Sequence, residues 1–244
     1  MSAEQRTGQI RRWLRRLVFF SARSTQISAL LFLVGCAIPH VPYRAVYEDP
    51  VNYVRLEEDD AVLPEWPPSA HAHPKAISVE EMTKLLRGFM VQQHRIWLQK
   101  WIQGEAPFEA AFRENEIRLL APQLAEALAE AKPNERISFY MSEPQTSVKR
   151  TITTGGLYMR KTEMHFILGN WQIIYGIPTY GMIYDRRYPM RPTAAKGFDL
   201  FFQPNNAVVK QSMGLWDTLL ANTKDELVID LSKIGASDVA NSSP

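Results

Sequence analysis

Two stretches in the middle of the chain carry hydrophobic residues at the spacing of an α-helix. Between residues 114 and 131 they recur every three or four positions, which predicts an amphipathic helix. Pro122 lies inside this pattern, so we expect a kink or a restart of the helix there. A shorter helix is predicted from Ser78 to Gly88, because Ser78 and Glu81 have the spacing of a capping box.

The stretch between these helices, residues 89–102, allows two interpretations. Phe89-Met90-Val91 has the composition of a strand, whereas Trp97 and Trp101 lie four positions apart, as on one face of a helix. We expect most of the tryptophans that follow the first 35 residues to lie in the core, with one or two lining an apolar groove. These are Trp66, Trp97, Trp101, Trp171 and Trp216.

After residue 136 the pattern becomes that of β-strands, rich in β-branched and aromatic residues. The predicted strands are Ile137–Met141, Val148–Met159, Met164–Tyr175, Phe198–Phe202, Ala207–Gln211 and Leu227–Leu231. Gly155-Gly156 suggests a turn or bulge, and Gln203-Pro204-Asn205-Asn206 suggests the loop of a hairpin. Because helices come first and strands follow, the sequence predicts an α+β fold with N-terminal helices packed on a largely antiparallel β-sheet.

The first 35 residues have the pattern of a secretory leader. They carry six of the 28 Lys and Arg residues and one of the 26 Asp and Glu residues, and a short apolar run, Ile27–Val34, follows the arginines. This run is too short for a permanent membrane span, which needs about 20 apolar residues. We therefore expect a cleaved signal. The pair Arg15-Arg16 leaves both general secretion and twin-arginine export open.

Leu33-Val34-Gly35-Cys36 ends the apolar run and contains the one cysteine of the chain. It resembles the lipobox of bacterial lipoproteins. The resemblance implies cleavage between Gly35 and Cys36, attachment of lipid to Cys36, and anchoring of the protein to a membrane in the cell envelope. Ala37 follows where an aspartate would favour retention in the inner membrane, which indicates the outer membrane.

Composition divides the rest of the chain into three parts. Residues 36–77 are rich in proline and are predicted to be a lipid-anchored tether, in which Tyr43–Leu56 is apolar enough to dock on the domain. Residues 78–234 are the predicted α+β globular domain. Residues 235–244 are small and polar, and we expect a disordered tail.

Charge and cysteine usage exclude several classes of function. Because the leader holds much of the positive charge, the remainder of the chain is net acidic. This argues against a nucleic-acid partner. With Cys36 carrying lipid, neither a disulfide nor a cysteine nucleophile is expected. The chain also lacks the sequence signatures of serine hydrolases, zinc proteases and P-loop enzymes, so no cofactor or metal is predicted.

A few polar residues remain as candidates for a site. His71 and His73, near Glu65, have a spacing that suits a metal on an extended chain, but we expect solvated side chains because they lie in the tether. His165 is expected on the polar face of a strand or as a hydrogen-bonded core histidine. The acidic run Glu57–Asp60 is expected to be solvated.

The best candidate for a partner-binding surface is the loop between Gly176 and Pro192. Its aromatic and arginine side chains suit an anchor for a protein partner or an anionic glycan, and the alternative is that they pair with carboxylates of their own domain. The candidate residues are Tyr184, Arg186, Arg187 and Tyr188.

Three functions are consistent with the sequence. The first is a non-enzymatic envelope lipoprotein that binds or assembles with an envelope protein or the cell wall. The second is a carrier of an apolar ligand such as lipid, which would need a continuous pocket. The third is an envelope hydrolase that uses carboxylates distant in sequence, which would need a buried acidic pair in a cleft.

Overall fold

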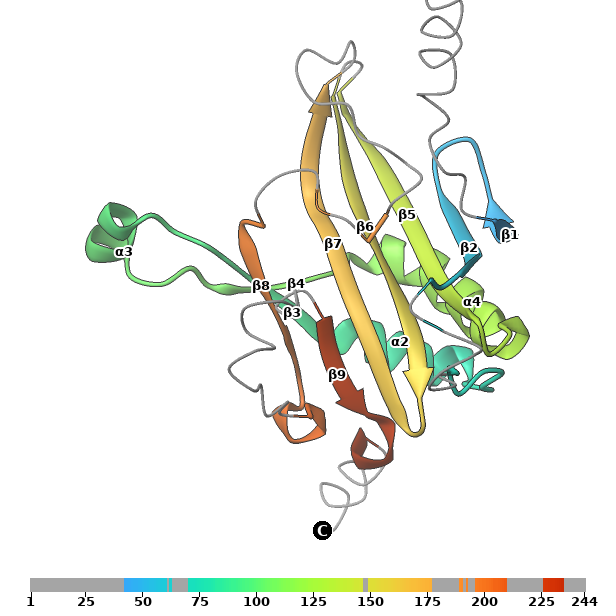
Figure 1. Ribbon diagram of the computed structural model, residues 1–244. Coiled ribbons are helices and arrows are strands. Elements are labelled where there is room, and N and C mark those ends of the chain that lie inside the picture. The colour runs from blue at the N-terminus through green and yellow to red at the C-terminus, as the bar shows by residue number, and fades with distance from the viewer. Residues whose placement is uncertain are drawn as a thin grey trace, which may run out of the picture. The chain divides into compact units, whose positions relative to one another are not determined.

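A six-stranded antiparallel sheet forms the main layer of the molecule (Figure 1). The computed structural model describes residues 42–60, 62, 70–146, 149–176, 189–190, 192, 196–209 and 226–234. In spatial order the strands of the main sheet are β1 (Tyr43–Glu48), β2 (Tyr53–Glu58), β5 (Glu135–Thr146), β6 (Lys149–Arg160), β7 (Glu163–Gly176) and β9 (Glu226–Asp230).

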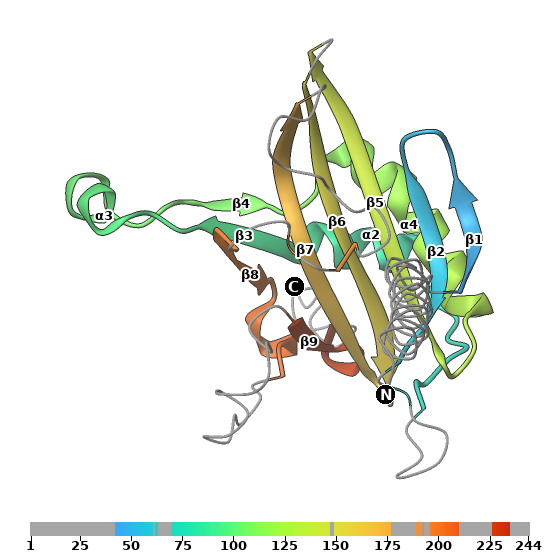
Figure 2. The same cartoon turned by 45° about the horizontal axis from the view of Figure 1, so that its top comes forward.

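A second sheet has three strands and extends into an arm. Its order is β4 (Phe108–Ala110), β3 (Phe89–Gln93) and β8 (Phe198–Phe202). The chain between β3 and β4 forms a helix, α3 (Trp97–Gln103). In both ribbon views α3 lies at the end of this arm, away from the main sheet (Figures 1 and 2).

Two longer helices pack together beside the main sheet. Helix α2 (Val79–Gly88) begins at the predicted capping box of Ser78 and Glu81. Helix α4 (Glu114–Glu130) continues through Pro122 as one element, so the restart that the sequence suggested does not occur. Its buried face contacts α2 and the strands β1, β2 and β5.

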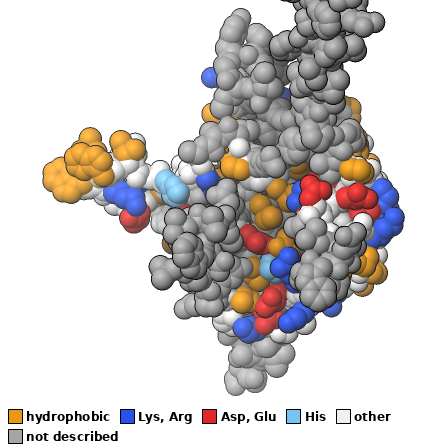
Figure 3. Space-filling model, in the orientation of Figure 1, with side chains coloured by type: hydrophobic (Ala, Val, Ile, Leu, Met, Phe, Trp, Pro, Cys, Tyr) orange, Lys and Arg blue, Asp and Glu red, His pale blue; other side chains and the backbone are white. Residues whose placement is uncertain are grey.

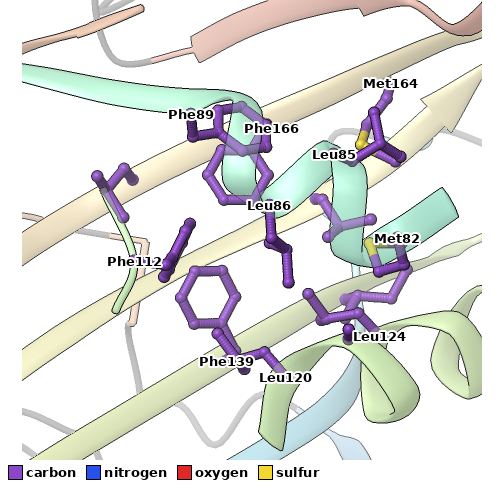
Figure 4. Close-up of a cluster of buried hydrophobic side chains, with 14 of the residues drawn as sticks. Met82, Leu85, Leu86, Phe89, Phe112, Leu120, Leu124, Phe139, Met164 and Phe166 are labelled. Carbon is purple, nitrogen blue, oxygen red and sulfur yellow. The ribbon is translucent and has the colours of Figure 1, made fainter. Parts of the chain in front are cut away.

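The core fills the space between these helices and the sheet with large side chains (Figure 4). Phe89 stacks on Phe166 with ring centroids 4.0 Å apart, and Phe112 meets both Phe139 and Phe166 edge to face. Leu120 and other residues of the α4 stripe are fully buried against this aromatic cluster. The hydrophobic periodicity of α4 therefore predicted its buried face correctly.

The order of the elements differs from the predicted order. The fold is α+β with a mostly antiparallel sheet, but the helices lie in mid-chain, because the hairpin β1–β2 precedes them. The predicted hairpin around residues 203–206 is also wrong. Residues Asn205–Ala207 form a 3-10 helix, and β8 pairs with β3 instead. The pair Gly155-Gly156 continues β6, next to a register shift at Thr154.

The segment predicted to be a tether contributes to the main sheet. Strand β1 pairs with β2, and β2 pairs with β5, so the hairpin β1–β2 belongs to the main sheet. The guanidinium of Arg44 donates to the Glu135 carboxylate at 3.2 and 3.1 Å and to the carbonyl of Glu130 at 3.1 Å. The start of β1 is thereby fastened to the end of α4. The compact part of the chain thus begins well before residue 78.

Among the described residues, none of the helices has the length and apolar content that crossing a membrane requires.

Candidate functional site

Titratable side chains gather where residues 70–77 cross the end of the main sheet. Strand β5 pairs with β6 as far as Leu157, and the chain around Ala72 continues beside the last part of β6. The amide of Ala72 donates to the carbonyl of Met159 at 2.7 Å, and the amide of Met159 donates to Nε2 of His73 at 3.4 Å. This pairing fixes both histidines of the segment and buries them.

His71 forms one half of a buried hydrogen-bonded pair. Its Nε2 lies 2.8 Å from the carboxylate of Asp59, and the second oxygen of Asp59 accepts from Arg136 at 3.3 Å. Since a carboxylate can only accept, Nε2 of His71 carries the proton. The expectation that His71, His73 and the run Glu57–Asp60 are solvated is therefore wrong for His71, His73, Glu57 and Asp59, which are all buried.

His165 forms a second pair on the neighbouring strands. Oε1 of Glu226 accepts from the Tyr158 hydroxyl at 2.5 Å and from Nδ1 of His165 at 2.6 Å. The ring of Tyr158 stacks on His165 at 4.7 Å and lies 4.5 Å from the ring of His71. The two pairs thus join through Tyr158 into one polar network, which we call the histidine network: Asp59, His71, His73, Arg136, Tyr158, His165 and Glu226.

Burial and hydrogen bonding shift several pKa values in this network. Burial, with His71 beside it, lowers the pKa of His73 to about 4. Burial and the hydrogen bond to Glu226 raise the pKa of Tyr158. For Glu226, burial acts to raise the pKa, but the hydrogen bonds from His165 and Tyr158 outweigh it and leave that pKa lowered. At neutral pH His73 is therefore uncharged and Glu226 ionised.

Three ring nitrogens of the histidine network are buried without a hydrogen-bond partner among the described residues. They are Nδ1 of His71, Nδ1 of His73 and Nε2 of His165. Within the same part of the chain, no group of three His, Cys, Asp or Glu side chains is placed to hold a metal ion. The arrangement supports a structural role.

Other buried carboxylates have partners that account for their burial. The Ser138 hydroxyl donates to Glu57 at 2.5 Å, and the Arg113 amide donates to Glu116 at 2.8 Å, while burial raises the pKa of both acids. Burial alone would raise the pKa of Glu135, but the hydrogen bonds from Arg44 and from the Lys132 amide, with the charges of Arg44 and Lys132, together outweigh it and lower that pKa. The charge of Glu143 also raises the pKa of Glu116, and Glu143 is itself paired with Arg113.

A surface groove of about 420 Å³ lies beside α2. Thr162 in the turn between β6 and β7 and the 3-10 helix Leu231–Lys233 complete it. Its lining mixes apolar side chains with charged ones of both signs: Lys75, Ile77, Glu81, Lys84, Leu85, Leu231 and Ile234. The groove is therefore amphipathic, and its apolar residues are continuous with the core, since Leu85 belongs to the core and Ile77 packs against it.

The most unusual surface of the protein is the end of the arm (Figure 3). Helix α3 has no buried residue, and the exposed fraction of its side chains reaches 78% for Trp97 and 82% for Trp101. Five large hydrophobic residues are exposed together, and we call them the apolar tip: Ile96, Trp97, Leu98, Trp101 and Ile102. The expectation that most tryptophans lie in the core is wrong for Trp97 and Trp101, and it holds for Trp171.

Polar contacts hold the tip in a defined shape. The guanidinium of Arg95 donates to the carbonyls of Gln103, Gly104 and Glu105 at 3.2, 3.1 and 3.4 Å, which closes the loop around α3. Gly104 ends the helix with a φ of 72°, a conformation that favours glycine. Lys100 pairs with Glu105 at 3.1 Å. Both cationic groups beside the helix are thus already engaged.

The base of the arm is fastened to β8. Nε2 of His94 lies 3.0 Å from the carboxylate of Asp199, and the amide of His94 donates to the carbonyl of Gly197 at 2.7 Å. The rings of Phe108 and Phe201 meet edge to face at 5.0 Å. The arm therefore projects as a supported ribbon.

Several predicted site residues lie outside the described residues. These are Gly35, Cys36, Glu65, Trp66, Tyr184, Arg186, Arg187, Tyr188 and Trp216. The described end of the predicted binding loop, Pro189 and Met190, rests on the sheet, where the carbonyl of Pro189 accepts from the Thr154 hydroxyl at 2.5 Å. Sequence reasoning missed the tip, although the four-residue spacing of Trp97 and Trp101 was its signal.

No protein-family model, curated protein or solved structure matches this chain.

Proposed function

We propose that this protein is a lipoprotein of the bacterial cell envelope, anchored through Cys36 and acting as a non-enzymatic binding or assembly module. The lipobox Leu33-Val34-Gly35-Cys36 supports the anchor, and Ala37 supports the outer membrane as its location. The apolar tip is the observation that supports binding, because an exposed patch of this kind marks an interaction surface.

The chemistry of the interior favours this proposal over the two alternatives. A lipid carrier needs an enclosed apolar cavity, whereas the space between α2, α4 and the sheet is filled by stacked aromatic side chains. A hydrolase needs a reactive constellation, whereas the buried acids described above are engaged with cations, hydroxyls or amides.

The anchor is tested by feeding cells a clickable palmitate analogue and separating the membranes. We expect label on the wild-type protein in the outer-membrane fraction and none on the Cys36→Ser variant. A wild-type protein that remains unlabelled would overturn the anchor.

The binding surface is tested with a photoreactive amino acid at position 99, on α3, and a matched one at Glu80, an exposed position on α2. We expect position 99 to cross-link to an envelope component, while position 80 does not. Equal cross-linking from both positions would remove the tip as the binding surface.

A further inference from the structure

The apolar tip has the distribution of side chains found on helices that lie in a membrane interface. On α3 the apolar residues at positions 97, 98, 101 and 102 fall on one face of the helix. The polar residues Gln99, Lys100 and Gln103 fall on the other face. A short helix with this division of faces places its apolar side in the headgroup region of a bilayer. Tryptophan is the residue that most favours this region, and two of the five tip residues are Trp.

We propose that the apolar tip inserts into the interfacial region of the lipid bilayer that carries the Cys36 anchor. This inference rests on the proposed function, because the anchor supplies the membrane. It identifies the partner of the binding surface as lipid.

The shape and size of the tip favour lipid over a protein. The tip is the projecting end of a ribbon (Figures 1 and 2), so a protein partner would have to provide a matching cavity, whereas a bilayer adapts to a convex group. A stable protein interface uses about 20 to 30 residues from each side. Helix α3 has seven residues, which is too few for a second copy of the chain to form a stable dimer through it.

The charges of the tip point in the same direction. Glu105 balances the charge of Lys100, and the guanidinium of Arg95, which donates to three neutral carbonyls, adds a single positive charge at the base of the tip. The apolar face itself carries no charge, so a strongly charged protein surface would gain little from it. Insertion driven by apolar side chains predicts binding to uncharged phosphatidylcholine, without a requirement for anionic lipid.

The position of the anchor makes the membrane available to the tip. Cys36 precedes Tyr43, the first residue of β1, by seven residues, so the link can span at most about 25 Å. In both ribbon views β1 and α3 lie at opposite ends of the domain. An anchor that joins the domain at β1 and a tip that inserts through α3 would be two distinct attachments to the bilayer.

The test uses the full chain, recovered from membranes and reconstituted in phosphatidylcholine vesicles with and without nitroxide-labelled lipid. An environment-sensitive fluorophore is placed through Ile102→Cys on the apolar face of α3, with Gln99→Cys on its polar face and Glu80→Cys on α2 as matched controls. We expect nitroxide lipid to quench the probe most at position 102, less at position 99, and least at position 80.

A second pair of variants shows which side chains carry the insertion. Trp97→Ala with Trp101→Ala should abolish the quenching at position 102, whereas Gln99→Ala with Gln103→Ala should preserve it. All four side chains are exposed, so neither pair should disturb the fold. A probe at position 102 that is no more quenched than the probe at position 80 overturns the inference. The inference is also overturned if the emission of the probe at position 102 shows that it is shielded from water while nitroxide lipid does not quench it. A protein would then cover the tip.

The thiol-reactive fluorophore of this experiment also distinguishes a failure of this inference from a failure of the proposed anchor. In the wild-type chain Cys36 is the only cysteine, and a lipid-bearing Cys36 cannot be labelled. Labelling of wild-type Cys36 would defeat the anchor, and the tip would then be tested in the Cys36→Ser background. A protected Cys36 with an unquenched tip would defeat the insertion alone.

Discussion

The imidazole of His71 lies 2.8 Å from the carboxylate of Asp59, with both side chains almost completely buried. Asp59 follows β2, and His71 precedes α2, so the pair joins the hairpin β1–β2 to the rest of the domain. Arg136 supplies the second partner of Asp59. A segment that composition assigns to a flexible tether is thereby fixed to the sheet.

Replacing Asp59 by alanine should destabilise the fold strongly. His71 and Arg136 would lose their acceptor, and removing one partner of a buried ion pair costs about 3 kcal/mol or more. Urea unfolding of both proteins gives the difference in the free energy of unfolding. Glu58→Ala is the matched control, because Glu58 is the exposed neighbour in β2. A small and equal effect of both changes would show that the buried pair contributes little.

His73 should make stability depend on pH in a defined window. Its pKa is about 4 in the folded protein, below the ordinary value of 6.5. As the pH falls below 6.5 the unfolded chain binds a proton that the folded protein does not, so stability is lost between pH 6.5 and 4. The loss from this group is at most about 3 kcal/mol.

The variant His73→Gln isolates this contribution, because glutamine retains an acceptor for the amide of Met159 but does not titrate. Urea unfolding of wild type and variant at pH 7.5 and pH 4.5 should show a smaller loss of stability for the variant. Parallel pH profiles would mean that His73 is protonated equally in the folded and unfolded states.

Gly169 should not tolerate a side chain. A Cβ atom there would lie 2.6 Å from the carbonyl oxygen of Pro189 and 2.7 Å from the carbonyl carbon of Met190. Since both contacts are to backbone, Gly169→Ala should cost about 1–3 kcal/mol or displace residues 189–190 from the sheet. Thermal unfolding and limited proteolysis measure the two effects. Gly197→Ala, with no atom within 4 Å of its Cβ, should leave both unchanged.

The tryptophans should divide sharply in their effect on stability. Trp97→Ala and Trp101→Ala should change the free energy of unfolding by less than about 0.5 kcal/mol, since both rings are exposed. Trp171→Ala should cost about 3–5 kcal/mol, because its ring is buried. Its Nε1 also donates to the Ala111 carbonyl at 3.0 Å. Denaturant titration of the three variants measures these differences in the free energy of unfolding. A marked loss of stability in Trp101→Ala would show that the tip contributes to the stability of the fold.

Local patterns predicted the elements of the fold well. The capping box at Ser78, the stripe of α4 and the β-branched and aromatic content of β5 to β7 are local features, so the sequence displays them directly. The pairing of β8 with β3 depends on chain segments about a hundred residues apart. The short loop after β8 suggested a local hairpin, and the sequence contains no signal for the distant partner.

The predictions for the candidate site residues were wrong for a related reason. His71 was expected in solvent because its neighbours in sequence are prolines and small residues, but its burial is set by Asp59 and Tyr158 from other elements. Most of the tryptophans are expected in the core, with one or two in an apolar groove. Trp97 is instead exposed because its helix lies at the end of a projecting ribbon, which periodicity alone does not reveal.

The fastening of β1 determines how the domain would bear mechanical load. Tension transmitted through the chain before Tyr43 enters at an edge strand, which pairs with β2 alone and could be peeled away one hydrogen bond at a time. Arg44 is the second residue of that strand, and its bonds to Glu135 and to the carbonyl of Glu130 must break before the strand can be peeled away. Through these bonds Arg44 therefore transmits a force applied at the N-terminal end of the domain to α4 and β5, so that β1 does not bear it alone.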